Sequence, residues 1–242
     1  MSAGRLIGVG VGPGDPELMT LKAVRALNTT DVVAFFAKAG NASHSRAIAA
    51  QYLHAGVIEL PLLYPVTTEL PSCSETYRET ICKFYDTAAT QIAAHIEAGR
   101  VVAVLSEGDP LFYGSYMHLH ARLAPRVPTE IVAGVTGMSG CWSAAATPIA
   151  QGDDVLTVLP ATLPEAELAR RLGDADAAVV MKVGRHLPKL RRALKTSGRL
   201  PRAIYVERGT MADAKMIPLA AKLDDDAPYF AVVLVPGWEQ QP

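Results

Sequence analysis

Residues 101–120, VVAVLSEGDPLFYGSYMHLH, form the stretch that decides the fold. The five apolar residues at its start predict a buried strand. A small acidic turn, Gly108-Asp109-Pro110, follows at the carboxyl end of that strand, and aromatic residues lie beyond the turn. In open α/β sheets, ligands bind at this end of the strands. The turn holds an acid and no lysine, so we do not expect it to bind phosphates or to support nucleotide hydrolysis.

The bulk composition describes a chain of 242 residues that is 50% hydrophobic and has a net charge of -1. This length allows one large or two modest domains. The neutral charge balance argues against a nucleic-acid partner, which needs a basic face. No apolar run approaches the roughly 20 residues of a membrane span, so no membrane partner is expected. Sparse cysteines (Cys73, Cys82 and Cys141) without metal-ligand spacing, and no visible signal peptide, predict a cytoplasmic protein.

Strands and helices alternate along the first half of the chain. Strands are predicted at residues 5–11, 31–36, 57–62 and 101–105, and helices at 17–27, 43–53, after 75 and at 115–124. Ser43 is a candidate N-cap, and Ser72 and Glu75 have the spacing of a capping box before the long third helix, which Gly99 ends. Such alternation predicts a mostly parallel sheet with helices on both faces.

A domain boundary is predicted near Pro125–Pro128, which gives domains at residues 1–124 and 125–242. The second domain opens with residues 130–133. Strands are predicted in it at residues 155–159, 177–181, 203–207, 214–218 and 229–235, and helices up to 146 and at 165–172 and 186–196. Helices become sparse toward the C-terminus, so the last strands are expected to be antiparallel hairpins in a mixed sheet. The fold class is therefore α/β, with two α/β domains.

The glycine loop at residues 8–15, GVGVGPGD, looks at first like a dinucleotide-binding fingerprint. Three details argue against an NAD site. Pro13 lacks an amide N–H where a pyrophosphate needs donors. The third glycine of the G-x-G-x-x-G register falls on that proline. Asp31, the acid at roughly the right distance, would begin the second strand, whereas a ribose-binding acid follows that strand's carboxyl end.

Taken together, the motifs resemble those of the tetrapyrrole (corrin/porphyrin) methyltransferases, a family that uses S-adenosylmethionine. The matching segments lie in the family's order and cover almost the whole chain: GVGPGDPE at 10–17, SEGDP at 106–110, AGVTG at 133–137, VVMK at 179–182, ERGT at 207–210 and the strand at 229–236. Three stretches resemble the branch that methylates carbon 20 of precorrin-2, namely residues 109–117, 183–186 and 205–211. Gly209 is a small departure, because that branch more often has alanine there.

The resemblance implies a fold of the tetrapyrrole methylase type, also called class III methyltransferase. Its N-terminal sheet is mostly parallel, its C-terminal sheet is mixed, a cleft lies between the two domains, and the protein is a homodimer. S-adenosylmethionine is implied as co-substrate and no metal as cofactor. Matched position by position, the implied donor-binding residues are Pro13, Glu107, Gly108, Asp109, Phe112, Thr136, Gly137, Met181 and Gly209.

The implied reaction converts precorrin-2 into precorrin-3A by methylation of ring carbon 20, a step of cobalamin biosynthesis. The accepting carbon is already nucleophilic, so positioning should supply most of the rate effect, up to roughly 7–11 kcal/mol. A proton must then leave carbon 20, and the candidate catalytic residues are Asp109, Tyr113, Tyr116 and Glu107. The candidate substrate-binding residues are Asp15, Tyr113, Tyr116, Arg46, Arg185 and Arg208. The arginines among them would bind the carboxylates of the macrocycle, and the tyrosines would face its ring.

Several alternatives stay open at this point. The enzyme could act on the cobalt-bearing factor, or methylate another ring carbon. Related methylases that act on diphthamide intermediates or ribosomal RNA share the same motifs, but the neutral charge balance and the aromatic stretch at residues 113–120 weigh against RNA. From other classes, an NAD-dependent oxidoreductase and a non-catalytic tetrapyrrole carrier remain as weaker hypotheses. His118 and His120 suggest a metal site, but residues two apart on a helix do not share a face, so none is predicted.

Overall fold

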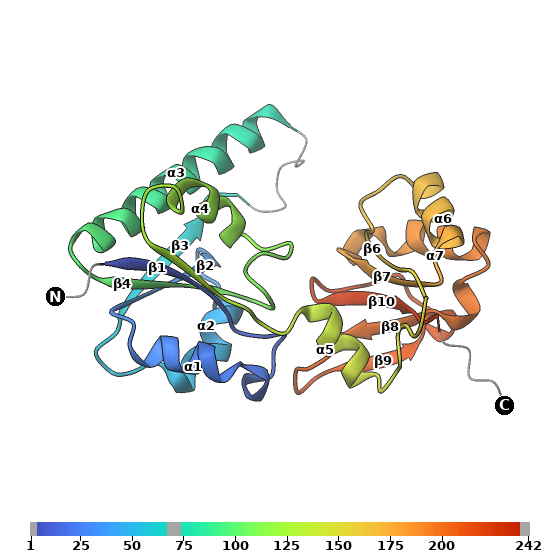
Figure 1. Cartoon of the computed structure of the whole chain (residues 1–242). Helices are drawn as coiled ribbons and strands as arrows, with labels where there is room; N and C mark the ends of the chain where they lie inside the picture. The colour runs from blue at the N-terminus through green and yellow to red at the C-terminus, as the bar shows by residue number, and fades with distance from the viewer. Residues whose placement is uncertain (1–3, 67–73, 238–242) are drawn as a thin grey trace. The chain divides into compact units, whose positions relative to one another are not determined.

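The computed structural model describes residues 4–66 and 74–237. The chain splits into two compact units, Met1–Thr136 and Gly137–Pro242 (Figure 1). The division falls after Thr136 and not at residue 124 as predicted. The reason is that strand β5 (Thr129–Val132) pairs with β1 (Arg5–Gly10) and so belongs to the first sheet.

The first unit contains a five-stranded sheet in the order β3-β2-β4-β1-β5. Besides β1 and β5, its strands are β2 (Val32–Lys38), β3 (Ile58–Tyr64) and β4 (Val101–Ser106). Every pairing between them is parallel, as predicted. All five carboxyl ends therefore lie along one edge of the sheet.

Helices cover both faces of this sheet, which is why its central strands are apolar throughout. Helices α1 (Leu21–Asn28) and α2 (His44–Ala49) pack on one face, and α3 (Glu75–Glu97) and α4 (Tyr116–Leu123) pack on the other (Figure 1). Short 3-10 turns at Pro16–Leu18 and Ala50–Tyr52 flank α1 and α2.

The helix starts agree only in part with the sequence predictions. Ser43 caps α2, where its Oγ accepts from the amide of Arg46 at 3.4 Å, as predicted. Ser74 caps α3 and accepts from the amide of Tyr77. Ser72, the predicted cap of α3, lies outside the described residues. The helix predicted from residue 17 begins only at α1, because a separate 3-10 turn occupies the residues before it.

The second unit contains a mixed sheet in the order β6-β7-β10-β8-β9. Its strands are β6 (Leu156–Pro160), β7 (Ala177–Met181), β8 (Ile204–Glu207), β9 (Lys215–Pro218) and β10 (Ala231–Val235). Strands β6 and β7 are parallel, and the pairings of β10 with β7 and β8, and of β8 with β9, are antiparallel. The mixed character predicted for this half is confirmed.

The two faces of the second sheet are covered unequally. Helices α6 (Glu165–Asp174) and α7 (Leu187–Thr196) bury one face in a large apolar core. On the other face, the described residues form one helix, α5 (Gly137–Ala144), and apolar side chains such as Trp142, Ile149 and Leu156 stay half-buried. Three 3-10 turns at Gly184–His186, Leu200–Arg202 and Leu219–Ala221 complete the unit.

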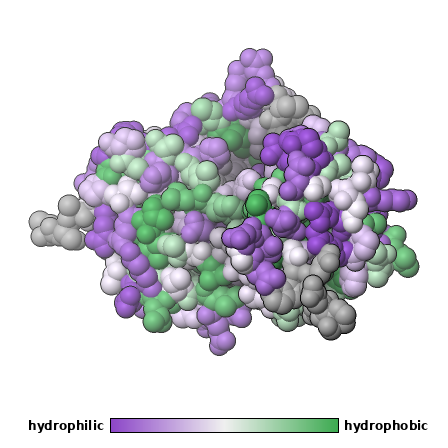
Figure 2. All heavy atoms as spheres, turned by 45° about the vertical axis from the view of Figure 1, so that its right-hand side comes forward, coloured by the Kyte–Doolittle hydropathy of each residue, from purple (hydrophilic) through white to green (hydrophobic). Residues whose placement is uncertain are grey.

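The face of the molecule drawn in Figure 2 shows no strong segregation of polarity. On the face drawn in Figure 2, hydrophilic and hydrophobic residues are interspersed. Among residues 4–66 and 74–237, no helix is both long and apolar enough to cross a bilayer.

Candidate active site

The topology of the first sheet marks a ligand-binding position between β1 and β4. These two strands lie side by side, yet the helices that follow them, α1 and α4, pack on opposite faces of the sheet. Adjacent strands with that property form a topological switch point, where the loops separate and a ligand can enter. The loops at this switch point are residues 11–15 and 107–110, two of the motifs singled out in the sequence.

Glycines bring three strand-end loops into direct backbone contact here; we call Gly10, Gly12, Gly108 and Gly134 the glycine junction. The amide of Gly108 donates to the carbonyl of Gly12 at 2.8 Å, and the amide of Gly12 donates back at 3.4 Å. A Cβ on Gly134 would lie 2.0 Å from the carbonyl oxygen of Gly108, and one on Gly10 would lie 2.6 Å from Gly134. No residue with a side chain fits at those two positions.

The side chain of Asp109 stabilises the glycine junction through two hydrogen bonds. Its Oδ1 accepts from the amide of Leu111 at 2.9 Å, the self-capping turn expected of an aspartate before proline. Its Oδ2 accepts from the amide of Gly134 at 3.1 Å, which joins the loop after β4 to the loop after β5. Because both oxygens bind backbone amides, the geometry supports a positioning role for Asp109 rather than proton transfer.

Glu107 is the partly buried charge of the same loop. Burial raises the pKa of its carboxyl group, while nearby His44 and a hydrogen bond with the backbone of Ser45 lower it. Both of these partners belong to the first turn of α2. A carboxylate with a raised pKa beside an open loop can attract a cation or hold a proton.

The aromatic segment after the turn divides into exposed and buried members. Tyr113 is 47% exposed and has a φ of 53°, and its ring meets that of Phe112 edge-on at 4.9 Å. Tyr116 is 0% exposed, and its ring takes the space beside Gly8. This placement makes Tyr116 a core residue and argues against the direct substrate contact predicted for it.

Hydroxyl groups also converge near this edge on the α3–α4 face, and the sequence predictions missed them. The hydroxyl of Tyr64, at the end of β3, donates to Ser115 Oγ and lies 3.5 Å from the hydroxyl of Tyr85. The ring of His118 stacks on Tyr85 at 4.4 Å between centroids. Ser106 Oγ is buried and has no hydrogen-bond partner among the described residues. The one signal in the sequence for these hydroxyl groups is that Tyr64 and Ser106 lie at the ends of predicted strands.

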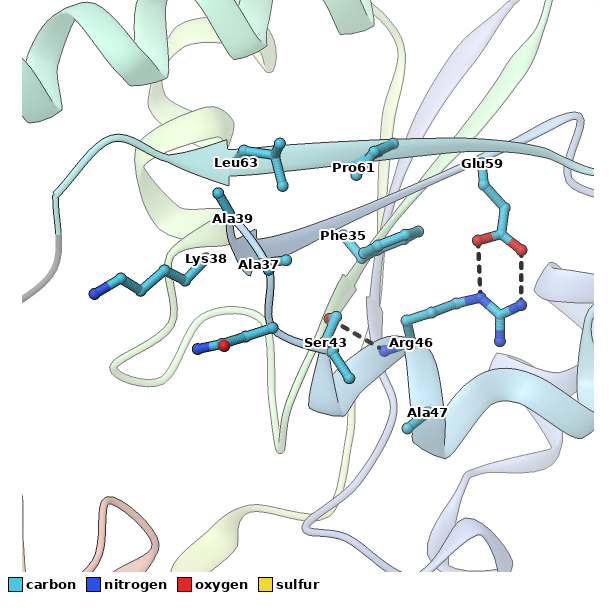
Figure 3. Close-up of a pocket in the computed structure, with 13 residues that line it drawn as sticks. Phe35, Ala37, Lys38, Ala39, Ser43, Arg46, Ala47, Glu59, Pro61 and Leu63 are labelled. Carbon is cyan, nitrogen blue, oxygen red and sulfur yellow. Dashed lines mark hydrogen bonds and ion pairs between the residues drawn. The ribbon is translucent and has the colours of Figure 1, made fainter.

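Arg46, predicted to bind substrate, lines a different feature of the first unit. An open pocket of about 570 Å³ lies between α2, the end of β2 and the face of β3, with Phe35, Pro61 and Leu63 among its lining residues (Figure 3). There the Arg46 guanidinium makes a two-point ion pair with Glu59, at 3.0 Å and 2.7 Å. The pocket shares no residue with the glycine junction, so this placement does not favour a role for Arg46 at that site.

Asp15 also has a local task. Its Oδ1 accepts from the amide of Glu17 at 2.8 Å and caps the 3-10 turn that follows the glycine loop. Asp31, the acid of the rejected dinucleotide fingerprint, lies at the opposite end of the strands, where its Oδ2 accepts from the amide of Val101 at 2.7 Å. An acid there is at the wrong end of the sheet for a ribose bound near the glycine loop.

The second unit holds the remaining predicted site residues at its own strand ends. Met181 ends β7, and its carbonyl accepts from the amide of Ala161 at 2.7 Å. Gly209 follows β8 and packs so closely on α5 that a Cβ would lie 2.9 Å from the Sγ of Cys141. Arg208 pairs with Asp213, and Arg185 is exposed in the 3-10 turn after β7.

The structure thus groups the predicted donor-binding residues in two sets. Pro13, Glu107, Gly108, Asp109 and Phe112 gather at the switch point of the first unit. Thr136 and Gly137 stand at the division between the units, and Met181 and Gly209 belong to the second. That the two sets face one cleft stays a prediction.

Over the described ranges 4–66 and 74–237, no three His, Cys, Asp or Glu side chains are arranged to hold a metal ion. The hydroxyl of Tyr116 lies 3.4 Å from His120 Nδ1, while His118 stacks on Tyr85, so the two histidines of α4 have separate surroundings.

Comparison with known proteins decides the family. The sequence model of the tetrapyrrole (corrin/porphyrin) methylases matches residues 5–224. The chain belongs to this family. It is 62% identical over 242 residues to the precorrin-2 C(20)-methyltransferase of a Sinorhizobium species. That match covers 100% of this chain and 99% of the other protein. It is 28% identical over 240 residues to the cobalt-precorrin-2 C(20)-methyltransferase of Salmonella typhimurium, with 98% of each chain covered.

A solved structure agrees with the fold. This chain superposes on the uroporphyrin-III C-methyl transferase of Thermus thermophilus, solved in complex with S-adenyl homocysteine, with a TM-score of 0.66. The two sequences are 22% identical, and the match covers 95% of this chain and 96% of that chain. The family resemblance and the two-sheet α/β fold class inferred from the sequence are both confirmed. Membership of a methylase family also removes the basis for the NAD-dependent alternative.

Proposed function

We propose that this tetrapyrrole methylase transfers a methyl group from S-adenosylmethionine to carbon 20 of precorrin-2 and yields precorrin-3A. The observation that carries the proposal is the 62% identity, along the whole chain, to a precorrin-2 C(20)-methyltransferase. The glycine junction at the switch point supplies the physical counterpart, because it is a preorganised ligand edge in the first unit.

The residues present suit the proposed methyl donor. S-adenosylmethionine supplies a methyl group on a positively charged sulfur, together with a nucleoside and an amino acid, and it carries no phosphate. The loops at the switch point offer backbone groups and the Glu107 carboxylate, and Pro13 makes them poor phosphate binders. Gly137, at the start of α5, has nothing within 4 Å of where its Cβ would be, so a ligand can approach its backbone.

The chain's own residues would act mainly by positioning. The junction and Asp109 fix the loop after β4, and oriented reactants can gain roughly 7–11 kcal/mol in such a reaction. Of the four candidates for accepting the proton that leaves carbon 20, Glu107 suits the task best, because burial raises its carboxyl pKa toward the working pH. Asp109 is occupied by two backbone amides, and Tyr116 is buried.

The substrate of this enzyme is the metal-free precorrin-2 in our proposal, and not its cobalt-bearing form. The much higher identity to the enzyme named for precorrin-2 than to the one named for cobalt-precorrin-2, 62% against 28%, supports the metal-free substrate. We also propose that the enzyme is a cytoplasmic homodimer that needs no metal cofactor, as the family resemblance implies.

One incubation tests the main proposal. The purified enzyme is given S-adenosylmethionine with a labelled methyl group, together with either precorrin-2 or cobalt-precorrin-2, and the product is mapped by NMR. Label at carbon 20 of precorrin-2 is the expected result. Label only in the cobalt-bearing substrate, or at another carbon, would replace the proposal with the sister activity. A calorimetric titration with S-adenosylhomocysteine checks donor binding independently of turnover.

A further inference from the structure

Backbone strain is concentrated at the ends of strands in this molecule. Among the described residues, four that are not glycine have a positive φ: Tyr113, Ala146, Lys182 and Arg208. Ala146 has an ordinary reason, because it ends α5 with backbone bonds back to Ser143 and, through Thr147, to Trp142. The other three directly follow strands or the turn after β4, and two of them are basic.

Lys182 and Arg208 lie at the same edge of the second sheet. Lys182 follows the last residue of β7, and Arg208 follows the last residue of β8. Both strands run antiparallel to β10, which lies between them, so they point in the same direction. With two strand spacings between them, the two backbones are about 9–10 Å apart.

Glycine would fit the backbone conformation at each of these two positions better than the residue that is present. A left-handed backbone is unfavourable for a residue with a side chain, whereas glycine adopts it freely. The φ values are 56° at Lys182 and 51° at Arg208, well inside that region. Non-glycine residues held in such conformations gather at ligand sites, where the strain fixes the direction of a side chain.

Both cationic side chains reach the surface of the second unit. Lys182 is exposed. Arg208 is 36% exposed and pairs with Asp213, itself 61% exposed, while Glu207 lies 3.9 Å away. Such exposed ion pairs contribute little, so a substrate carboxylate can replace Asp213 with small loss. Each cation is also the immediate neighbour of an implied donor-binding residue, Met181 or Gly209.

We propose that Lys182 and Arg208 form a two-point clamp for the peripheral carboxylates of the tetrapyrrole, and that backbone strain fixes the direction of both side chains. This inference rests on the proposed function, because it assigns residues to the polycarboxylate substrate of that reaction. It differs from a purely structural role, in which the left-handed residues would only turn the chain.

Substitutions that separate strain from charge test the clamp. Lys182→Gly and Arg208→Gly remove both the cation and the strain, whereas Lys182→Gln and Arg208→Gln remove only the cation. The probe is uroporphyrin, a stable tetrapyrrole polycarboxylate, and its affinity for the full-length enzyme is measured by fluorescence quenching. We expect each of the four variants to weaken binding roughly tenfold, and only the glycine variants to raise the melting temperature, by about 2–4 °C.

Two matched controls and one further ligand make the outcome decisive. Ala146→Gly relieves a left-handed residue that carries no charge, and Arg170→Gln removes an exposed arginine of α6 that pairs with Glu167; neither should alter uroporphyrin binding. S-adenosylhomocysteine affinity should survive in the glutamine variants. Unchanged uroporphyrin affinity in all four variants, or equal loss of both ligands, would overturn the clamp. Clamp-dependent uroporphyrin binding without methylation of precorrin-2 would instead overturn only the proposed function.

Discussion

The strand-end loops of the two units are built on opposite principles. In the first unit, the glycine junction brings backbone against backbone, and the side chain of Asp109 binds two backbone amides. In the second unit, the corresponding loops keep side chains at positions that favour glycine, namely Lys182 and Arg208. The first edge is therefore defined mainly by missing side chains, although Tyr113 keeps one, and the second mainly by retained ones, although Gly209 lacks one.

This difference assigns different tasks to the two edges. A junction of bare backbone presents N–H and C=O groups in fixed positions, which suits a ligand held through its own polar groups. An edge with strained cations recognises charge on a larger molecule. Substitutions should therefore affect folding most strongly in the first unit and ligand choice in the second.

Gly134→Ala is expected to have the largest effect. The new Cβ would lie 2.0 Å from the carbonyl oxygen of Gly108, an atom that cannot move without breaking the junction. We expect a loss of about 3 kcal/mol or more in the free energy of unfolding, or failure to fold. Denaturant unfolding of the soluble fraction measures it.

The matched control is Gly173→Ala in α6, where the added Cβ has nothing within 4 Å. Alanine there should leave stability unchanged or raise it by up to about 1 kcal/mol, as expected for a helix. A Gly134→Ala enzyme as stable as this control would show that the close approach at the junction is not needed for folding.

Asp109→Ala should have the second largest effect on stability, because it removes two hydrogen bonds to backbone amides but leaves the glycines of the junction in place. The amides of Leu111 and Gly134 would lose their acceptor, at a cost of about 2 kcal/mol, which lowers the melting temperature by roughly 4–8 °C. The enzyme should still fold, yet its affinity for S-adenosylhomocysteine, measured by calorimetry, should fall beyond detection. Normal affinity with a lowered melting temperature would restrict Asp109 to a structural role.

Much of this contrast could be predicted for the first unit. Its motifs consist of glycine, proline and aspartate, whose conformational preferences are local and therefore visible in the sequence. The alternation of strands and helices likewise gave the parallel sheet. The boundary near residue 124 was placed too early, because pairing of β5 with β1 is a long-range contact that no local pattern reports.

The sequence was less informative about side chains that depend on packing. Tyr116 shares a motif with Tyr113, but only one of the two is exposed, since the helix phase of α4 turns Tyr116 onto Gly8. Arg46 carries a charge suited to a carboxylate, yet Glu59, thirteen residues away in the chain, already pairs with it. Strain at Lys182 and Arg208 is a backbone property that their residue types do not predict.

Gly209→Ala tests whether glycine in the second unit matters as it does in the first. The added Cβ would lie 2.9 Å from Cys141 Sγ and 3.0 Å from Cys141 Cα, which is tight but less severe than at Gly134. We expect a loss of about 1–3 kcal/mol in the free energy of unfolding. Adding Cys141→Ala removes the sulfur contact and should restore part of the loss. An unfolding free energy unchanged by Gly209→Ala would mean that α5 can shift away from the loop.

Glu107→Gln should have the smallest effect on stability and the opposite sign. Burial raises the carboxyl pKa of Glu107 in the folded state, so the folded protein holds this proton more tightly than the unfolded chain does. Wild-type stability therefore falls as pH rises through the unfolded pKa of about 4.3 toward the folded value, and glutamine avoids that loss. The variant should melt at a higher temperature than the wild type near pH 7, and the gap should close below about pH 4.

The same substitution should weaken the donor site, because a neutral amide attracts the positively charged methyl donor less than a carboxylate does. A roughly tenfold loss of S-adenosylmethionine affinity is expected at pH 7. Glu97→Gln, at the exposed end of α3, is the control and should change neither quantity. A melting-temperature gap that persists unchanged to acid pH would contradict a buried carboxylate at position 107, and the first unit's edge would then depend on its backbone alone.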